Sequence, residues 1–529
     1  MSDQQQSNNF SNLFSNTTTT PEDEIEKKFH QRQEQYSNSE NFTELKQNAI
    51  SNELSRTKDE RSKMFMQRRM KIKITVDKAE SLKNKLTISN ELYEQCNQME
   101  VQPEDLLKCI ELFRTEDINQ KYKGLVALRK MLSYPTNPPI QEIIDFNLVT
   151  DFINLLNNSY PEFQYEALWC LTNIASGTSD QANTIIVKGG LNQIIPLVDS
   201  SIEELQNQAV WTIGNLAGDS LKSREQIIQS KGFDKIINVF STTQRHSLIK
   251  NCTWAISNFL KVKPIMSYDD CESCIIHVIR GINLLPEDKE FLVDACWILS
   301  FMTENYKASI KQILDTDILP LLFTFLNFDI SYIVLSVLRI IGNIASGNAN
   351  QTQLLIDKGV LNYLKQTIYN SKKSIRKESA WILSNIAAGT QRQIEILINE
   401  NFLPLLTEVI KKDDPEIQKE AIWAVCNLTS IEKPILMKIL IEQNIIELIC
   451  ECLKMKDAKY LAVSLESFGN LLAYGKKYLM VDGVNKIVTK VEELGMFDVL
   501  ESLQYHPVEV VYEKTIKLPE NYFDTENTQ

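Results

Sequence analysis

Histidine is scarce in this sequence, and the residue patterns that most enzymes and metal sites need are missing. Four histidines occur in 529 residues, and none stands in a recurring acid/base setting: His30, His246, His277 and His506. No glycine-rich loop has the spacing of a phosphate-binding motif. Cys271 and Cys274 form a lone CxxC without the second ligand pair that a structural zinc site requires. These gaps argue against an enzyme, and we expect neither a cofactor nor a metal.

Helix-breaking residues and long apolar runs are also few. Only 16 Gly and 15 Pro accompany 43% hydrophobic residues, so the chain can form uninterrupted helices around ample core material. No apolar run reaches the roughly 18 residues that span a bilayer, and the N-terminus is polar rather than a signal peptide, so we expect no membrane insertion. Because the ten cysteines are scattered, we expect reduced core thiols in an intracellular protein.

Positive charge is in deficit, except in one segment. The net charge of −13 disfavours direct nucleic-acid binding and favours basic partners. Residues 1–54 are rich in Ser, Asn, Gln and Thr, which predicts disorder. Residues 55–87 are instead strongly basic, and we expect a flexible arm there, either a solvated tail or a segment that docks onto a partner and back onto its own body. The basic residues proposed to act in this arm are Arg56, Arg61, Arg68, Arg69, Lys71, Lys73, Lys78, Lys83 and Lys85.

One motif returns at a nearly constant interval through most of the chain. Each copy has a Trp, or a substitute, four residues before an Asn, or a substitute, and the Trp positions are 169, 211, 254, 297, 339, 381, 423 and 466. A period of roughly 40 residues built from helices is typical of HEAT and armadillo solenoids, in which each unit buries its apolar face against its neighbours. We therefore predict an all-α, right-handed armadillo-repeat solenoid of about ten units over residues 101–515, followed by a tail at 516–529.

The order of helices within a unit also follows from the sequence. The segments Lys188-Gly189-Gly190 and Lys358-Gly359 read as helix terminators, because Gly adopts the left-handed cap conformation without strain. Each unit is therefore predicted to contain a short helix, a second helix after the Gly, and a third helix that bears the Trp-x-x-x-Asn motif.

The motif itself has a structural and a functional interpretation. Four residues advance a helix by about 400°, so Trp and Asn lie on nearly the same face. In isolation, Trp would be a core wedge and Asn an inter-repeat hydrogen-bond partner. All six tryptophans of the chain occupy the motif position, however, which favours a ligand groove. There, Asn amides can bind the backbone of an extended peptide, and parallel indole faces can hold Lys or Arg stems.

These features together resemble the importin-α (karyopherin-α) family of nuclear import adaptors. The resemblance rests on the Trp/Asn array, on Asn173-Ile174-Ala175-Ser176-Gly177, on Gly214-Asn215-Leu216-Ala217-Gly218-Asp219, on Asp294-Ala295-Cys296-Trp297 and on the basic N-terminal arm. It covers about residues 55–523. It implies a groove that binds Lys/Arg-rich nuclear localisation signals of cargo, and an arm that binds importin-β or, in its absence, the groove.

The resemblance also assigns residues to two cargo sites. The major site would comprise Trp169, Asn173, Gly177, Trp211, Asn215, Asp219, Trp254, Asn258, Asp294 and Trp297. The minor site would comprise Arg339, Asn343, Glu378, Trp381, Asn385, Glu420, Trp423 and Asn427. Arg339 would interrupt the Trp run and so separate the two.

The same resemblance implies further partners and a location. The C-terminal region would engage an export receptor of the exportin type with Ran-GTP, and the protein would shuttle between cytoplasm and nucleus through nuclear pores. Because the arm has fewer arginines than is usual in the family, deletion of residues 1–87 is expected to tighten signal binding only modestly. The alternative is a catenin-like armadillo scaffold that binds other extended peptides without a transport role. The acidic flanks of the motif disfavour it.

Overall fold

A computed structural model describes residues 87–522 of the chain. The N-terminal segment expected to be disordered and the basic arm, with all nine of its basic residues named above, lie outside the described residues. The described residues divide into two compact parts, 87–318 and 319–522, each of which is considered by itself.

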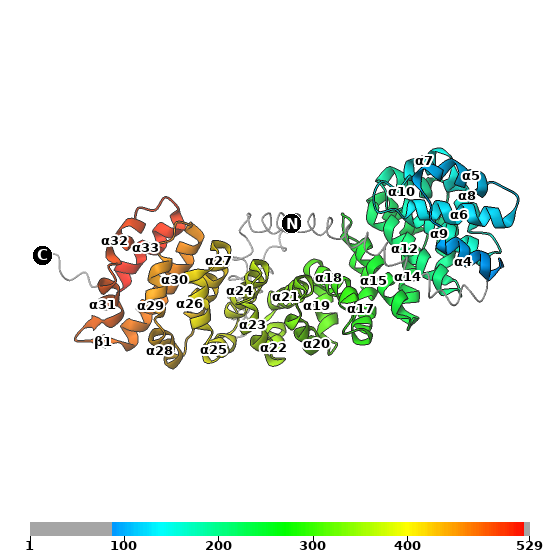
Figure 1. The fold of residues 1–529 in the computed structure, drawn as a ribbon. Helices are drawn as coiled ribbons and strands as arrows, with labels where there is room; N and C mark the ends of the chain where they lie inside the picture. Colours follow the sequence, from blue (N-terminus) through cyan, green and yellow to red (C-terminus); the bar gives the residue numbers. More distant parts are fainter. Residues whose placement is uncertain (1–86, 523–529) are drawn as a thin grey trace, which may run out of the picture. The chain divides into compact units, whose positions relative to one another are not determined.

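The first part, residues 87–318, is a succession of short and long helices (Figure 1). Its elements are α4 (Asn90–Gln98), η2 (Pro103–Asp105), α5 (Leu106–Phe113), α6 (Ile118–Leu132), α7 (Ile140–Asp145), α8 (Leu148–Leu155), α9 (Pro161–Ile174), α10 (Ser179–Val187), α11 (Leu191–Ile194), η3 (Ile195–Asp199), α12 (Glu203–Asp219), α13 (Leu221–Gln229), α14 (Gly232–Thr242), α15 (His246–Lys261), α16 (Tyr268–Cys271), α17 (Ser273–Leu284), α18 (Lys289–Asn305) and α19 (Lys307–Leu314).

The second part, residues 319–522, continues the pattern and adds one two-stranded hairpin, in which β1 and β2 pair antiparallel. Its elements are α20 (Leu319–Thr324), η4 (Phe325–Asn327), α21 (Ser331–Ala345), α22 (Ala349–Asp357), α23 (Val360–Thr367), α24 (Lys373–Ala387), α25 (Gln391–Asn399), α26 (Phe402–Lys412), α27 (Pro415–Leu428), α28 (Pro434–Glu442), α29 (Ile445–Cys452), α30 (Ala458–Tyr478), β1 (Met480–Val481), β2 (Val484–Asn485), α31 (Lys486–Glu493), α32 (Phe497–Leu503) and α33 (Glu509–Tyr522).

The helices group into three-helix repeats, which confirms the all-α repeat fold. Each copy of the motif lies on a third helix, and third helices pack against one another in chain order. In the first part this row is α6, α9, α12, α15 and α18, and in the second it is α21, α24, α27, α30 and α33. Leu171, Ile174, Ile213 and Leu216, which lie between or beside Trp and Asn, are fully buried, as expected of core residues. The expected tail boundary at residue 516 falls inside α33, and α4 lies ahead of the expected start at 101.

A left-handed residue separates the first helix from the second in most repeats. Gly189 and Gly359 have φ of 81° and 89°, which confirms them as helix terminators. At four further turns, non-Gly residues adopt the same conformation: Asn147, Lys231, Asn401 and Asn444. Three of these four are Asn, the residue that tolerates positive φ best after Gly.

Three first helices begin with the same capping box. The cap side chains accept a hydrogen bond from the backbone N–H of the Gln three residues later, and the Oε1 of that Gln accepts one from the backbone N–H of the cap residue. The pairs are Thr178 with Gln181, Asn348 with Gln351, and Thr390 with Gln393. A Gly precedes each cap. A Cβ on Gly177 would lie 2.4 Å from Gln181 Oε1, and a Cβ on Gly347 or Gly389 would lie 2.0 Å from the corresponding Gln. These glycines are therefore required by the capping box.

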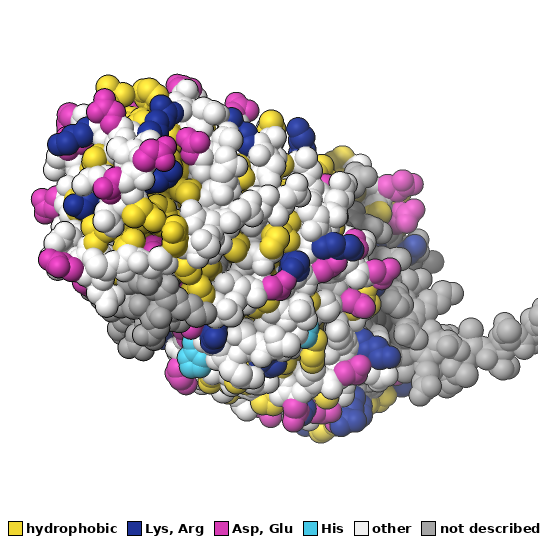
Figure 2. Space-filling model, turned by 90° about the vertical axis from the view of Figure 1, so that its right-hand side faces the viewer, with side chains coloured by type: hydrophobic (Ala, Val, Ile, Leu, Met, Phe, Trp, Pro, Cys, Tyr) yellow, Lys and Arg dark blue, Asp and Glu magenta, His cyan; other side chains and the backbone are white. Residues whose placement is uncertain are grey.

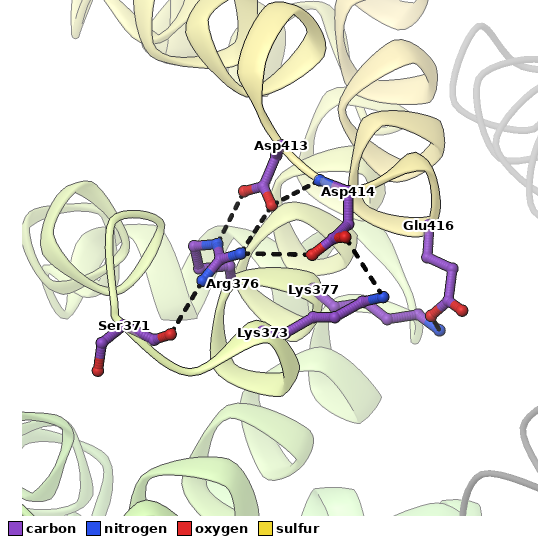
Figure 3. Close-up of polar contacts among 7 residues, drawn as sticks. All are labelled: Ser371, Lys373, Arg376, Lys377, Asp413, Asp414 and Glu416. Carbon is purple, nitrogen blue, oxygen red and sulfur yellow. Dashed lines mark hydrogen bonds and ion pairs between the residues drawn. The ribbon is translucent and has the colours of Figure 1, made fainter.

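Ion pairs also join neighbouring repeats at their loops. Arg376, at the start of α24, donates from Nε and Nη2 to the two carboxylate oxygens of Asp413, both at 2.8 Å (Figure 3). It also donates to the carbonyl oxygens of Asn370 and Ser371. Lys373 and Lys377 extend this network to Asp414 and Glu416. On the face drawn in Figure 2, Lys and Arg side chains are interspersed with Asp and Glu.

The cysteines all lie in the interior of the described residues. All ten cysteines are free and buried, which confirms that they are core thiols and includes the CxxC pair at Cys271 and Cys274. Within residues 87–522, no helix has the length and apolarity needed to span a membrane. In the same range, no cluster of three or more His, Cys, Asp or Glu side chains could hold a metal ion.

Candidate functional site

The motif residues lie on the stacked third helices and form one ladder in each part of the chain. The first ladder comprises Trp169 and Asn173 on α9, Trp211 and Asn215 on α12, Trp254 and Asn258 on α15, and Trp297 with Phe301 on α18. The second comprises Arg339 and Asn343 on α21, Trp381 and Asn385 on α24, and Trp423 and Asn427 on α27. Trp169, Trp254 and Trp381 are buried, whereas Trp211, Trp297 and Trp423 are only partly covered.

Three of the motif Asn side chains connect their repeat to the one before it. Asn173 Nδ2 donates to Ser133 Oγ at 2.9 Å, and Asn215 Nδ2 donates to the Thr172 carbonyl at 3.1 Å. Asn427 Nδ2 makes a weaker contact of 3.4 Å with the Ser384 carbonyl. The inter-repeat role of Asn is therefore present. An amide carries two N–H donors and one acceptor oxygen, so this role uses only part of its hydrogen-bonding capacity.

Two of the tryptophans, Trp254 and Trp381, pack against a glycine of the preceding repeat. A Cβ on Gly214 would lie 2.5 Å from Trp254 Cζ3, and a Cβ on Gly342 would lie 2.0 Å from Trp381 Cζ3. Both glycines stand three residues after a Trp position. Small residues occupy this place throughout the array, namely Thr172, Gly214, Ser257, Ser300, Gly342, Ser384 and Cys426. The sequence analysis did not predict a role for these small residues, although they recur at the same 42- or 43-residue spacing as the Trp positions.

The expectation of parallel indole faces is wrong for the neighbouring pair Trp211 and Trp254. The rings of Trp211 and Trp254 lie 6.4 Å apart with an interplanar angle of 77°, an edge-on arrangement. The edge-on arrangement follows from the contact with Gly214, because the edge of the Trp254 ring occupies the space that a Cβ on Gly214 would need. In the fourth repeat, Trp297 stacks on Phe301 at 5.4 Å and 22°, so an aromatic ring replaces the Asn of the motif.

Acidic side chains recur three residues before Trp. Asp294, Glu378 and Glu420 were assigned from the sequence, whereas Glu166 at the same position was missed. Asp294 and Glu420 are buried, and Glu378 is partly exposed. Burial, followed by the charge of Glu420, raises the pKa of Tyr460, whose hydroxyl is hydrogen-bonded to Trp423. Glu420, Trp423 and Tyr460 therefore form one cluster in the second ladder.

Two of these acids are already paired with an arginine of the preceding repeat. Arg129 Nε donates to Glu166 Oε2 at 2.7 Å, and its guanidinium lies 4.4 Å from the centre of the Trp169 ring. Arg339 Nε approaches Glu378 Oε1 at 3.4 Å. The arginine that was expected to interrupt the Trp run thus contacts the acid of the next repeat.

Asp219 lies at the end of α12, two turns after Trp211. Its Oδ1 accepts a hydrogen bond of 2.8 Å from Ser179 Oγ. Its Oδ2 is shielded from solvent and has no hydrogen-bond partner among residues 87–522. A shielded carboxylate oxygen without a partner is costly, so this atom is suited to receive a cation. Gly177, assigned with Asp219 to the same pocket, leads into α10, and Ser179 is the first residue of that helix.

Comparison with protein families identifies the repeats. The "Armadillo/beta-catenin-like repeat" family model matches residues 136–176, 178–218, 348–388 and 390–430. The "Atypical Arm repeat" model matches residues 485–529. A crystal structure of an engineered protein superposes with a TM-score of 0.65 at 22% identity, over 79% of this chain and 99% of that one, which supports the fold alone.

Curated relatives align over most of the chain. Importin subunit alpha-1b of Oryza sativa subsp. japonica is 30% identical over 424 residues, which is 79% of each chain. Importin subunit alpha-1a of the same plant is 33% identical over 413 residues, 77% of this chain and 78% of the relative. Importin subunit alpha-3 of Arabidopsis thaliana is 34% identical over 269 residues, and there the chain spans half of the relative's length.

Proposed function

The chain belongs to the importin subunit alpha family, and from this premise we propose that it is a nuclear import adaptor whose two ladders bind basic localisation signals. Membership of this family supports the general role, in which the chain binds nuclear localisation signals of cargo and works with importin-β. The finer assignment of residues to sites, the role of the arm, release by an exportin-type receptor with Ran-GTP, and shuttling between cytoplasm and nucleus are parts of the proposal.

The single observation that best supports the proposed groove is the shielded Oδ2 of Asp219, which has no hydrogen-bond partner among the described residues and lies on the same helix as the partly covered Trp211. A Lys side chain of an extended peptide could lay its methylene stem on the indole and direct its ammonium at this oxygen. The unused hydrogen-bonding groups of Asn215 would bind the peptide backbone. Together these contacts recognise a chain that is both extended and basic.

The proposed arm acts through tethering. A short flexible tether gives an effective concentration on the order of millimolar, so even a weak contact of the basic arm with the groove competes with cargo. Binding of the arm to importin-β would remove this competitor and couple cargo loading to carrier binding. In the folded part, the chain directly after the arm is held in place, because the backbone N–H groups of Thr87 and Ile88 donate to Glu162 Oε1.

A bridging experiment tests the adaptor role. Immobilised importin-β is mixed with a fluorescent basic signal peptide, alone or with the full chain. We expect retention of the peptide only when the full chain is present. A variant lacking residues 1–86 keeps the anchoring amides of Thr87 and Ile88, and it should bind the peptide in solution but not retain it on importin-β.

The same truncation tests autoinhibition. The truncated chain should bind the peptide more tightly than the full chain, by less than about a hundredfold because the arm is only moderately basic. Equal retention on importin-β with and without the arm would contradict the proposed carrier-binding role. A gain above about a hundredfold would contradict the proposal that autoinhibition is weak.

A further inference from the structure

Lys261 places a positive charge of the protein itself within the first ladder. It is the last residue of α15 and follows Asn258 by three residues, so the two side chains lie on the same side of the helix. Its Nζ donates a hydrogen bond of 2.7 Å to Asn258 Oδ1. The acceptor atom of this ladder amide is therefore engaged by an ammonium group.

The same ammonium lies against the end of the preceding third helix. It is 3.0 Å from the place that a Cβ on Gly218 would occupy, and Asn258 Cβ and Cγ are 3.1 Å from that place. Gly218 is the penultimate residue of α12, which ends at Asp219. The C-terminus of a helix carries a partial negative charge and attracts cations. Lys261 therefore occupies two sites to which a basic side chain of a ligand could also bind: the Oδ1 acceptor of Asn258 and the C-terminal end of α12.

No other rung has a basic residue at this position. The residue three places after the motif Asn, or after its substitute Phe301, is small or acidic in all other copies: Ser176, Gly218, Glu304, Ser346, Ala388, Ser430 and Ala473. At Asn173, Asn215 and Asn427, the amide donates to the preceding repeat. The third rung differs from these in both sequence and hydrogen bonding.

We propose that Lys261 is a specificity-determining residue that makes the third rung of the first ladder reject Lys and Arg and prefer an acidic or neutral hydrogen-bonding side chain of the bound peptide. This inference rests on the proposed function. A basic peptide residue placed there would face a like charge and would have to displace the ammonium from Asn258. An acidic residue would instead add a favourable charge pair. The basic run recognised by the first ladder would therefore end before this rung.

A positional peptide scan tests the proposal. Each position of a basic signal peptide is changed in turn to Lys, Ala or Asp, and each peptide is titrated by fluorescence anisotropy against the full chain. We expect one position at which Asp binds better than Lys, by about fivefold or more. In Lys261→Gln this preference should vanish at that position alone. Lys261→Arg, which keeps the charge, should preserve it.

The matched control is Lys307→Gln, which removes the same charge from an exposed residue at the start of α19. It should leave the positional profile unchanged. Identical profiles for the unmodified chain and Lys261→Gln, or an equal shift at every position, would overturn the inference. If no basic peptide binds the unmodified chain at all, the proposed function fails instead, so the two failures are distinguishable.

Discussion

The two parts of the chain contain the same grouping of arginine, acid and tryptophan in different surroundings. In the first part, the side chains of Arg129 and Glu166 are 8% and 2% exposed, with a contact of 2.7 Å and a cation–π contact to Trp169. In the second part, Arg339 and Glu378 are 23% and 18% exposed, and their closest atoms are 3.4 Å apart. One pair is sealed, whereas the other is open to solvent.

The difference in burial predicts a difference in role. A buried charge that loses its partner is left without solvation. Separation of Arg129 from Glu166 is therefore costly, and we expect the pair to stay intact at the start of the first ladder. A partly exposed pair is screened by water and contributes little to stability. Glu378 can therefore exchange Arg339 for a cation of a peptide, as the proposed minor site requires.

The largest expected effect follows from breaking the sealed pair. Arg129→Met should destabilise the first part by about 3–5 kcal/mol, because Glu166 would stay buried without a partner. Urea denaturation followed by circular dichroism measures this loss. The double variant Arg129→Met/Glu166→Met should recover most of it, because no charge is then left buried. A single variant as stable as the unmodified chain would show that the pair is not sealed.

A smaller effect is expected from adding a methyl group at the glycines that contact the indole rings. Gly342→Ala and Gly214→Ala each place a methyl group against the ring of Trp381 or Trp254, and overpacking of this kind costs about 1–3 kcal/mol. Since the approach is 2.0 Å at Gly342 and 2.5 Å at Gly214, the second part should lose more than the first. Denaturation midpoints and the Trp fluorescence spectrum report both changes. The reverse order would mean that the backbone around Gly342 adjusts more easily.

The two parts should also differ in their response to pH. Hydrogen bonding by Arg376 is the main cause of a lowered pKa for Asp413. The ionised Asp413 contributes its full stabilisation of the folded state above the ordinary Asp pKa of about 3.9. This stabilisation is lost as the pH falls through the lower pKa of Asp413 in the folded state. Alkaline pH acts on both parts, because burial raises the pKa of Tyr93 in the first part to about 12 and also raises the pKa of Tyr460 in the second, so that stability is lost as the pH rises above the ordinary Tyr value.

Arg376→Met tests the acid side of this contrast. It should cost about 1 kcal/mol at neutral pH and remove part of the acid dependence of unfolding. Lys438→Met, which removes an exposed cation paired with Glu442 on α28, is the control and should leave the acid limb unchanged. An unaltered acid limb in Arg376→Met would mean that the Asp413 pair does not contribute to stability.

The smallest effect is expected from the open pair. Arg339→Gln should change stability by roughly 0.5 kcal/mol or less. It should strengthen binding of a peptide with two basic clusters by up to about fivefold, because Glu378 no longer has an internal cation. Isothermal titration measures this gain against Glu378→Gln, which should weaken binding. Weaker binding to Arg339→Gln would indicate that the arginine itself contacts the peptide.

The repeat fold could be predicted because it depends on periodicity. The 42- or 43-residue spacing of Trp and the glycines at 189 and 359 were enough to predict the repeat and the order of its three helices. The orientation of the indoles could not be predicted, because it depends on which residue of the preceding repeat lies beneath each ring. Arg129 was missed for a similar reason, because its contact with Glu166 joins two neighbouring repeats and spacing along one helix does not report it. Lys261, three residues after Asn258 on the same helix, could have been found from the sequence.

The central claim is that the partly covered first-ladder rung of Trp211 and Asn215 binds basic peptides, and one titration tests it most directly. A fluorescent peptide with a single basic cluster is titrated against the full chain, Trp211→Ala/Asn215→Ala and the matched variant Trp423→Ala/Asn427→Ala. We predict that the first variant loses at least about a hundredfold in affinity while its circular dichroism is unchanged, and that the second retains binding. Undiminished affinity in Trp211→Ala/Asn215→Ala would contradict the account.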